Sequence, residues 1–310
     1  MNEYIVSIGG SNIDIQGFSK ENILLRESNP AKINICAGGV ERNIVHNLSN
    51  LGLYNIKFIT SIGNDIFGDI LLNNIKSLNV DTSYIVKKGS STTYMAIMNS
   101  DKDMYLAVSD MDDLDKNITI EYLETIKDII KNAKFITVDA VIKREIFEYL
   151  IKNFPDKKLL CDAVSVKKAE NIKGLEKHIY ALKLNSNEAS FLLDKDISTI
   201  EEGLEAVERF IDIGVSEIYI TFAEKGICYA STKTKPAHLN APKVNILNAS
   251  GAGDAFMAGI IYSIYNNFDL DCKVKFAAIM SMLALESEET VSNNISLENV
   301  QQRLKLIFNC

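Results

Sequence analysis

The sequence predicts an α/β fold in which a mostly parallel sheet carries helices on both faces. Short apolar runs such as 135–138 and 158–161 alternate with amphipathic helical segments such as 143–153. Polar or glycine-containing turns follow several of these runs, which is where ligands bind in open parallel sheets. Two β-prone excursions interrupt the alternation, and they predict a small lid of strands beside the core.

The composition is typical of a soluble globular protein. The chain has 310 residues, of which 47% are hydrophobic and 24% charged, with a net charge of −8. This acidic balance argues against binding to nucleic-acid polymers or anionic membranes. The start of the sequence resembles no signal peptide, and no apolar run reaches membrane-spanning length. We therefore expect a cytoplasmic protein without a membrane or nucleic-acid partner.

Cysteine and histidine are too dispersed to indicate a metal or disulfide framework. The five cysteines include no CxxC pair, and only three histidines occur. This pattern favours free thiols in a reducing compartment.

The first polar cluster follows an apolar run at 4–8. Gly9-Gly10-Ser11 leads to Asn12 and Asp14, which would stand just past the end of a buried strand. Both side chains are candidates for binding substrate hydroxyls, and an Asx turn is the structural alternative.

A second cluster opens a helix. Gly38 and Gly39 precede an amphipathic segment that Gly52 ends, and Asn43 lies one turn inside it. A glycine pair at a helix entry lets a ligand approach the backbone closely. A strand at 56–62 and a helix from about 66 to 78 are expected next.

The two β-prone excursions cover about residues 15–36 and 90–109. Residues 94–98 and 104–108 are apolar runs across a polar turn, which predicts a hairpin. We expect residues 1–310 to form one domain whose lid covers a ligand and contributes to a homodimer contact.

The remaining chain supplies further elements. Expected helices are 121–131, 143–153, 201–213, 270–285 and 297–308, and expected strands are 135–138, 158–161, 178–184, 217–221 and 226–231. Asn185 and Glu188 follow one of these strands, and their spacing also fits a helix-capping pair.

The stretch Gly251-Ala252-Gly253-Asp254 carries the clearest chemistry. We expect a strand end to turn through both glycines into a helix that begins near Asp254. Free amides at a helix start bind anions, and an aspartate beside an anion is best explained as a base that deprotonates an attacking hydroxyl. The alternative is that Asp254 only caps the helix.

These four motifs, in this order, resemble the ribokinase-like (PfkB) family of carbohydrate and nucleoside kinases. The resemblance covers nearly the whole chain and implies a three-layer α/β/α core with a small β-strand lid. It also implies that Asp254 is the general base and that Gly251, Ala252 and Gly253 form the anion hole. Asn12, Asp14, Gly38, Gly39 and Asn43 would bind the acceptor.

The resemblance also implies a set of nucleotide-binding residues and cofactors. The residues that would bind ATP are Asn185, Thr221, Gly226, Lys167, Gly251 and Gly253. Glu188 would hold Mg²⁺, mainly through water. The family usually has Asp-Thr before Gly-Ala-Gly-Asp, where this chain has Asn248-Ala249-Ser250. The missing carboxylate at position 248 bears on a monovalent-cation site, so K⁺ is only an optional cofactor.

A narrower resemblance is to the bacterial pseudouridine kinases. Residues 39–43, 108–111, 161–169 and 286–291 carry it. It implies ATP-dependent phosphorylation of the 5′-hydroxyl of pseudouridine, with Ser109 and Asp110 at the lid edge reading the base. The alternatives are another family kinase of the ribokinase, adenosine kinase or fructokinase type, or a non-catalytic nucleoside-binding protein.

Overall fold

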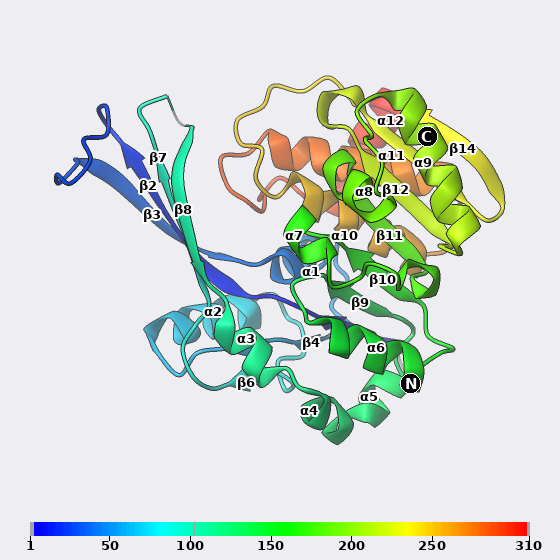
Figure 1. The fold of residues 1–310 in the computed structure, drawn as a ribbon, viewed down its shortest axis with the longest axis horizontal. Helices are drawn as coiled ribbons and strands as arrows, with labels where there is room; N and C mark the ends of the chain where they lie inside the picture. The colour runs from blue at the N-terminus through cyan, green and yellow to red at the C-terminus, as the bar shows by residue number, and fades with distance from the viewer. Residues whose placement is uncertain (1–2, 102, 309–310) are drawn as a thin grey trace.

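The computed structural model describes residues 3–101 and 103–308, and its core has three layers (Figure 1). The middle layer is an eight-stranded sheet with the order β14-β13-β12-β11-β10-β9-β1-β4. Strands β12, β11, β10, β9, β1 and β4 run parallel to one another. Strands β13 and β14 are antiparallel and form one edge of the sheet. The strands are β1 (Ile5–Ile8), β4 (Ile56–Ile59), β9 (Ile136–Asp139), β10 (Leu159–Asp162), β11 (Ala181–Asn185), β12 (Glu217–Thr221), β13 (Ile227–Ser231) and β14 (Thr234–Leu239).

Helices cover both faces of this sheet. One apolar cluster joins it to α1 (Val40–Asn50), α10 (Ala252–Tyr265), α11 (Leu270–Leu285) and α12 (Leu297–Phe308). The other joins it to α4 (Ile120–Thr125), α5 (Lys127–Lys131), α6 (Arg144–Asn153), α8 (Ser186–Leu193) and α9 (Ile200–Ile213). Neighbouring strand residues such as Ile5 and Val6 belong to opposite clusters. Both strand faces are therefore buried, which is why the strands are almost continuously apolar.

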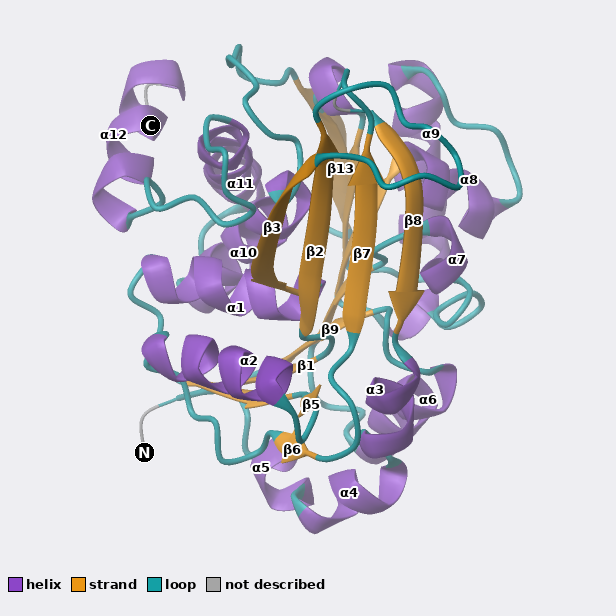
Figure 2. Cartoon of the chain, turned by 90° about the vertical axis from the view of Figure 1, so that its left-hand side faces the viewer, coloured by secondary structure: helices purple, strands orange, loops and turns teal. Residues whose placement is uncertain are grey.

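A second sheet of four strands projects from the core (Figures 1 and 2). Its order is β3 (Ala31–Gly38), β2 (Asn12–Ser19), β7 (Thr93–Met98) and β8 (Met104–Asp110). We call it the lid sheet. At its base, Ile13 packs against Leu71 of α2 (Ile66–Ser77). The short elements β5 (Ser61–Ile62), β6 (Val86–Lys87) and α3 (Asp112–Asn117) join this region to the core.

Several local expectations were wrong. The predicted helix 121–131 is two helices, α4 and α5, which meet at Ile126. Residues 176–178 form a 3-10 turn, so the strand expected from His178 begins at Ala181. Strand β14 was not predicted because Pro236 and His238 interrupt its apolar pattern.

The start of α10 also differs from expectation. Irregular chain, not a strand, leads into it from residue 240, and the helix begins at Ala252. Gly251 alone makes the turn, with a φ of 81°, while Gly253 lies within the helix. Among the described helices, none is both long and apolar enough to span a membrane.

Candidate active site

The predicted site residues lie where the parallel strands end. Asp139, Asp162, Asn185 and Thr221 are the last residues of four parallel strands of the central sheet. Helices α1 and α10 pack together beside the carboxyl ends of these strands, and their first turns lie there (Figure 1). The topology thus brings together motifs that are more than two hundred residues apart in the chain.

Asn43 and Asp254 meet directly. Asn43 donates from Nδ2 to Asp254 Oδ2 at 2.8 Å, which joins the first turns of α1 and α10. Asp254 is the third residue of α10, and Gly251 occupies the N-cap without a side-chain hydrogen bond. Asp254 is therefore not the N-cap residue of its helix, and its carboxylate contacts Asn43.

The surroundings of Asp254 suit a base that works near neutral pH. Burial raises the pKa of its carboxyl to about 7, and the nearby charge of Asp162 adds to the rise. The hydrogen bond from Asn43 and the charge of Lys183 lower the pKa and limit the shift. A carboxyl held near neutrality combines a populated charged form with useful basicity.

The start of α10 combines a tight glycine turn with amides that have no partner within the helix. A Cβ on Gly251 would lie 1.9 Å from the carbonyl oxygen of Thr290, so only glycine fits this turn. The first amides of a 14-residue helix carry the positive end of its dipole. This end of α10 can therefore hold an anion beside Asp254.

Lys183 is the main site residue that the sequence interpretation missed. It lies on β11, is 8% exposed, and its Nζ is 3.1 Å from Asp162 Oδ2. A Cβ on Gly253 would approach this Nζ to 2.9 Å, so the ammonium stands against the first turn of α10. Burial lowers the pKa of Lys183, but the charges of Asp162, Glu188 and Asp254 outweigh it and give a net rise. The available signal was a lysine inside an apolar strand, two residues before Asn185.

Asn12 and Asp14 at the start of β2 form a second wall of the site, together with Gly38 and Gly39. Asn12 donates to Asp14 Oδ1 at 2.6 Å. A Cβ on Gly38 would lie 2.2 Å from Asp14 Oδ2. Gly39 has a φ of 100°, and a Cβ on it would clash with the Gly10 carbonyl oxygen. Burial raises the pKa of Asp14, while Asn12 and Arg42 oppose the rise. Gly38 therefore lets β3 pass close to this carboxylate, and Gly39 lets the start of α1 approach the loop after β1.

A buried acidic pair supports the loop after β1. Asp139 Oδ2 accepts hydrogen bonds from the amides of Gly10 and Glu41, at 2.9 and 3.0 Å. The Glu41 carboxylate accepts from Ser7 and Thr137. Burial raises the pKa of Glu41 to about 8 and that of Asp139 to about 6. Asp139 thus ties the strand leading to Asn12 to the start of α1.

Asn185 and Glu188 form the capping pair that the sequence analysis named as an alternative. Glu188 Oε2 accepts from the Asn185 amide at 2.8 Å, and Asn185 Oδ1 accepts from the Glu188 amide at 2.9 Å. Asn185 Nδ2 also donates to Glu188 Oε1 at 2.6 Å. Each carboxylate oxygen already has a partner, which suits contact with a metal through water better than direct ligation. Among the described residues, no group of three or more candidate ligands could hold a metal ion.

The other predicted residues belong to β12 and to the segments that follow β10 and β12. Thr221 donates to the Leu184 carbonyl at 3.3 Å, and Gly226 follows the short turn after β12 with a φ of 102°. Lys167 is exposed on a helix of four residues, α7 (Val166–Ala169).

The lid residues predicted to read the base fall on opposite faces. Ser109 pairs with Tyr94, which pairs with Asp14, so Ser109 shares the face of Asp14. Asp110 is the next residue along β8, so its side chain belongs to the other face. The lid register therefore favours Ser109 over Asp110 for a ligand held by Asp14.

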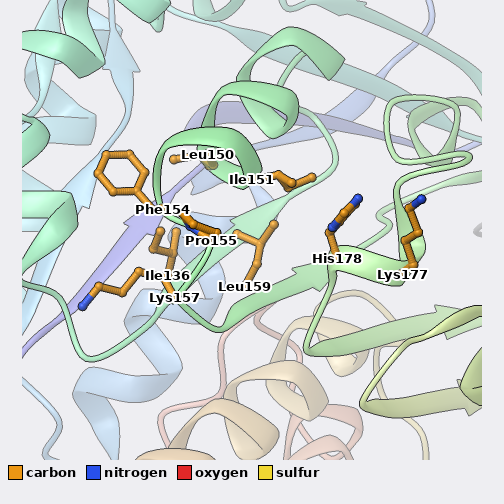
Figure 3. A pocket seen from close by; sticks show the side chains of 9 residues that line it. All are labelled: Ile136, Leu150, Ile151, Phe154, Pro155, Lys157, Leu159, Lys177 and His178. Atoms are coloured by element: carbon orange, nitrogen blue, oxygen red, sulfur yellow. The ribbon is translucent and has the colours of Figure 1, made fainter.

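A separate hollow lies at the amino ends of central strands (Figure 3). It has a volume of about 310 Å³ and contains Ile136 and Leu159, the first residues of β9 and β10. Because the polar clusters follow the other ends of these strands, this hollow is not part of the candidate active site.

Comparison with known proteins identifies the class. The pfkB family of carbohydrate kinases matches residues 2–296, so the chain belongs to this family. Its fold is ribokinase-like, and it is a phosphotransferase with an alcohol acceptor.

Three particular proteins illustrate the similarity. The pseudouridine kinase of Escherichia coli is 31% identical over 96% of this chain and 95% of its own length. A crystal structure of a sugar kinase candidate from Clostridium perfringens has a TM-score of 0.86 at 31% identity, covering 98% of this chain and 96% of that one. The ribokinase of Arabidopsis thaliana, solved with ribose and ATP, has a TM-score of 0.83 at 19% identity, covering 98% and 99%.

Proposed function

We propose that this protein phosphorylates the 5′-hydroxyl of pseudouridine, using ATP as the phosphoryl donor. The observation that carries the proposal is the hydrogen bond between Asn43 and Asp254. It joins the helix that would bind the acceptor to the carboxylate at the anion-binding start of α10. The choice of pseudouridine follows the similarity to the Escherichia coli pseudouridine kinase.

In the proposed reaction, Asp254 takes the proton from the acceptor hydroxyl. The hydroxyl oxygen forms a bond to the γ-phosphorus while the bond from that phosphorus to the β-phosphate oxygen breaks, and ADP leaves. The amides of Gly251, Ala252 and Gly253 and the ammonium of Lys183 stabilise the charge on the transferring group.

Asn12, Asp14, Gly38, Gly39 and Asn43 would hold the ribose, with Ser109 of the lid near the base. Asp14 Oδ2 is on the side of Gly38, and Asn43 contacts the proposed catalytic base, Asp254. The nucleotide would lie along Asn185, Thr221 and Gly226, at the ends of β11 and β12. Lys167 would reach its phosphates from α7.

The residues fit a magnesium nucleotide in one respect. Glu188 presents a buried carboxylate near Lys183, and both of its oxygens are engaged by Asn185. It would hold Mg²⁺ through water, while the phosphates supply most direct ligands. Bound Mg²⁺ would neutralise phosphate charge. K⁺ is an optional addition, because the family often has an aspartate where this chain has Asn248. Asn248 lacks that carboxylate and donates to the Glu288 carbonyl.

The test is ADP release measured with pseudouridine, uridine, adenosine, ribose and fructose side by side. We expect the highest kcat/KM with pseudouridine. A higher value for another acceptor would replace the substrate and keep the kinase class. Binding of a nucleoside without ATP turnover on any acceptor would favour the non-catalytic alternative.

We also propose that the lid sheet forms a homodimer contact. Its outer face carries Ile33, Ile35, Met95, Leu106 and Val108, which are 40–65% exposed. By the strand register these residues share one face of the lid sheet, on which Asp110 also lies near the base. Two copies would bury this face against itself. Light scattering should show a dimer, and Ile35→Lys should give a monomer; a monomeric wild type would contradict the contact.

A further inference from the structure

Arg42 is a buried cation whose hydrogen bonds all go to uncharged groups. Its side chain is 3% exposed. Nε and Nη2 donate to Asn74 Oδ1 at 3.0 and 2.6 Å, and Nη2 contacts His46 Nδ1 at 3.1 Å. Nη1 donates to the Ala37 carbonyl at 3.1 Å and to Asn43 Oδ1 at 2.8 Å. These contacts use all five N–H donors of the guanidinium.

The charge of Arg42 is not balanced by a direct partner. Among the ion pairs of the described residues, none includes Arg42. Burial lowers its pKa to about 10, and the charges of Cys36, Asp14 and Asp254 oppose this. His46 supplies no charge, because burial and Arg42 lower its pKa to about 4. Burying a cation is costly, so its placement between Asp14 and Asp254 calls for a reason.

The contact with Asn43 fixes the direction of one carboxamide. Because Asn43 Oδ1 accepts from Arg42, its NH₂ group must face the other way, toward Asp254 Oδ2. Asn74 of α2 and Ala37 at the lid base hold the guanidinium on its other sides. One side chain therefore connects the lid, α2 and the candidate base.

We propose that Arg42 is a positioning residue that orients the carboxamide of Asn43, and through it the carboxylate of Asp254, for proton transfer. Arg42 would touch neither the acceptor nor the nucleotide. The inference rests on the proposed phosphotransfer at Asp254, but it does not depend on which acceptor is used. It assigns a role to the arginine of Gly39-Val-Glu-Arg-Asn43 beyond helix packing.

Arg42 acts in two separable ways, through its shape and through its charge. The groups that act on Asp254 are Asp162 from β10, Asn43 from α1, Lys183 from β11 and Asp139 from β9. Arg42 adds a positive charge on the α1 side. Its removal should raise the pKa of Asp254, so the acid limb of the activity profile should move to higher pH.

Two variants separate these contributions. Arg42→Met removes both the donors and the charge. Arg42→Lys keeps the charge, but one ammonium cannot reproduce the planar fork that spans Asn43 and Asn74. Arg144→Met is the matched control, because Arg144 is exposed on α6 and contacts Glu148 and the Lys173 carbonyl.

The expected results distinguish positioning from folding. For Arg42→Met, kcat should fall about 10- to 100-fold, as for other losses of alignment, with KM for ATP within about twofold. Its acid limb should shift upward. Arg42→Lys should lose kcat with a smaller upward shift of the acid limb, because the charge remains while the hydrogen bond from Asn43 is weakened. Arg144→Met should match wild type. Active-site titration corrects each value for the folded fraction.

A second measurement does not need turnover. Carboxyl ¹³C NMR, with Asp254→Asn used to assign the resonance, follows the titration of Asp254 in the full chain. Its midpoint should rise more in Arg42→Met than in Arg42→Lys. If wild type phosphorylates no acceptor, the proposed function fails while this titration still tests Arg42. An unchanged midpoint and kcat in Arg42→Met would overturn the inference.

Discussion

Replacing Lys183 with methionine removes a buried ammonium on which the charges of Asp162, Glu188 and Asp254 act. Methionine fills a similar volume but removes the ammonium that lies 3.1 Å from Asp162 Oδ2 and beside Gly253. Two effects should follow, one on stability and one on catalysis.

The effect on stability comes from Asp162, which is 1% exposed. Removing one partner of a buried ion pair leaves an uncompensated charge, which typically costs about 3–5 kcal/mol of unfolding free energy. Val164 donates to Asp162 Oδ1 at 2.8 Å, so part of the charge is still compensated. We therefore expect a loss near the lower end, about 3 kcal/mol. Urea unfolding measures it.

The effect on catalysis comes from the start of α10. Loss of one donor aimed at developing charge typically lowers kcat by about 10²–10³. The double variant Lys183→Met with Asp162→Asn separates the two effects, because it removes both charges. It should regain most of the stability and little of the kcat. Recovery of kcat together with stability would show that Lys183 is only structural and would refute the reasoning.

Three further predictions follow from the same geometry. Because Asp254 must be charged to accept a proton and its pKa is about 7, kcat/KM should rise from pH 5 to pH 8 with a midpoint near 7; a flat profile over this range would contradict the base. The same raised pKa stabilises the folded state only at low pH, and this stabilisation is lost as pH rises through 7. Asp254→Asn should therefore gain about 1–3 kcal/mol of unfolding free energy relative to wild type at pH 8, and less at pH 5. Urea titration at both pH values measures the difference. Gly253→Ala should keep the wild-type melting temperature but lower kcat, because the added Cβ displaces the Lys183 ammonium. Gly251→Ala should lose about 1–3 kcal/mol of unfolding free energy, because its φ of 81° and the Thr290 carbonyl exclude a side chain. Equal melting temperatures for the two variants would contradict this difference.

Much of the fold could be predicted because each element carries its own local signal. Helices α11 and α12 match their predicted bounds, and the buried strands are continuous apolar runs. The failures lie where local signals conflict. In β14, proline and histidine hide an edge strand, and before α10 the chain is irregular although a strand was expected.

The site was only partly predictable for a different reason. Motifs such as Gly38-Gly39 and Gly251-Ala252-Gly253-Asp254 are local, so sequence patterns can find them. The roles of Lys183 and Arg42 depend on side chains that meet across the fold, such as Asn74 and Asp162. A lysine in an apolar strand is a signal of burial, but only the fold shows which charges surround it.

The most direct test of the central claim is the turnover of Asp254→Asn. Asparagine keeps the shape of the side chain and an oxygen that can accept from Asn43, so ligand affinity should stay within several-fold. The carboxylate is lost, so kcat should fall by about 10²–10⁴, the range for a general base. Turnover equal to wild type at pH 8 would show that Asp254 does not deprotonate the acceptor.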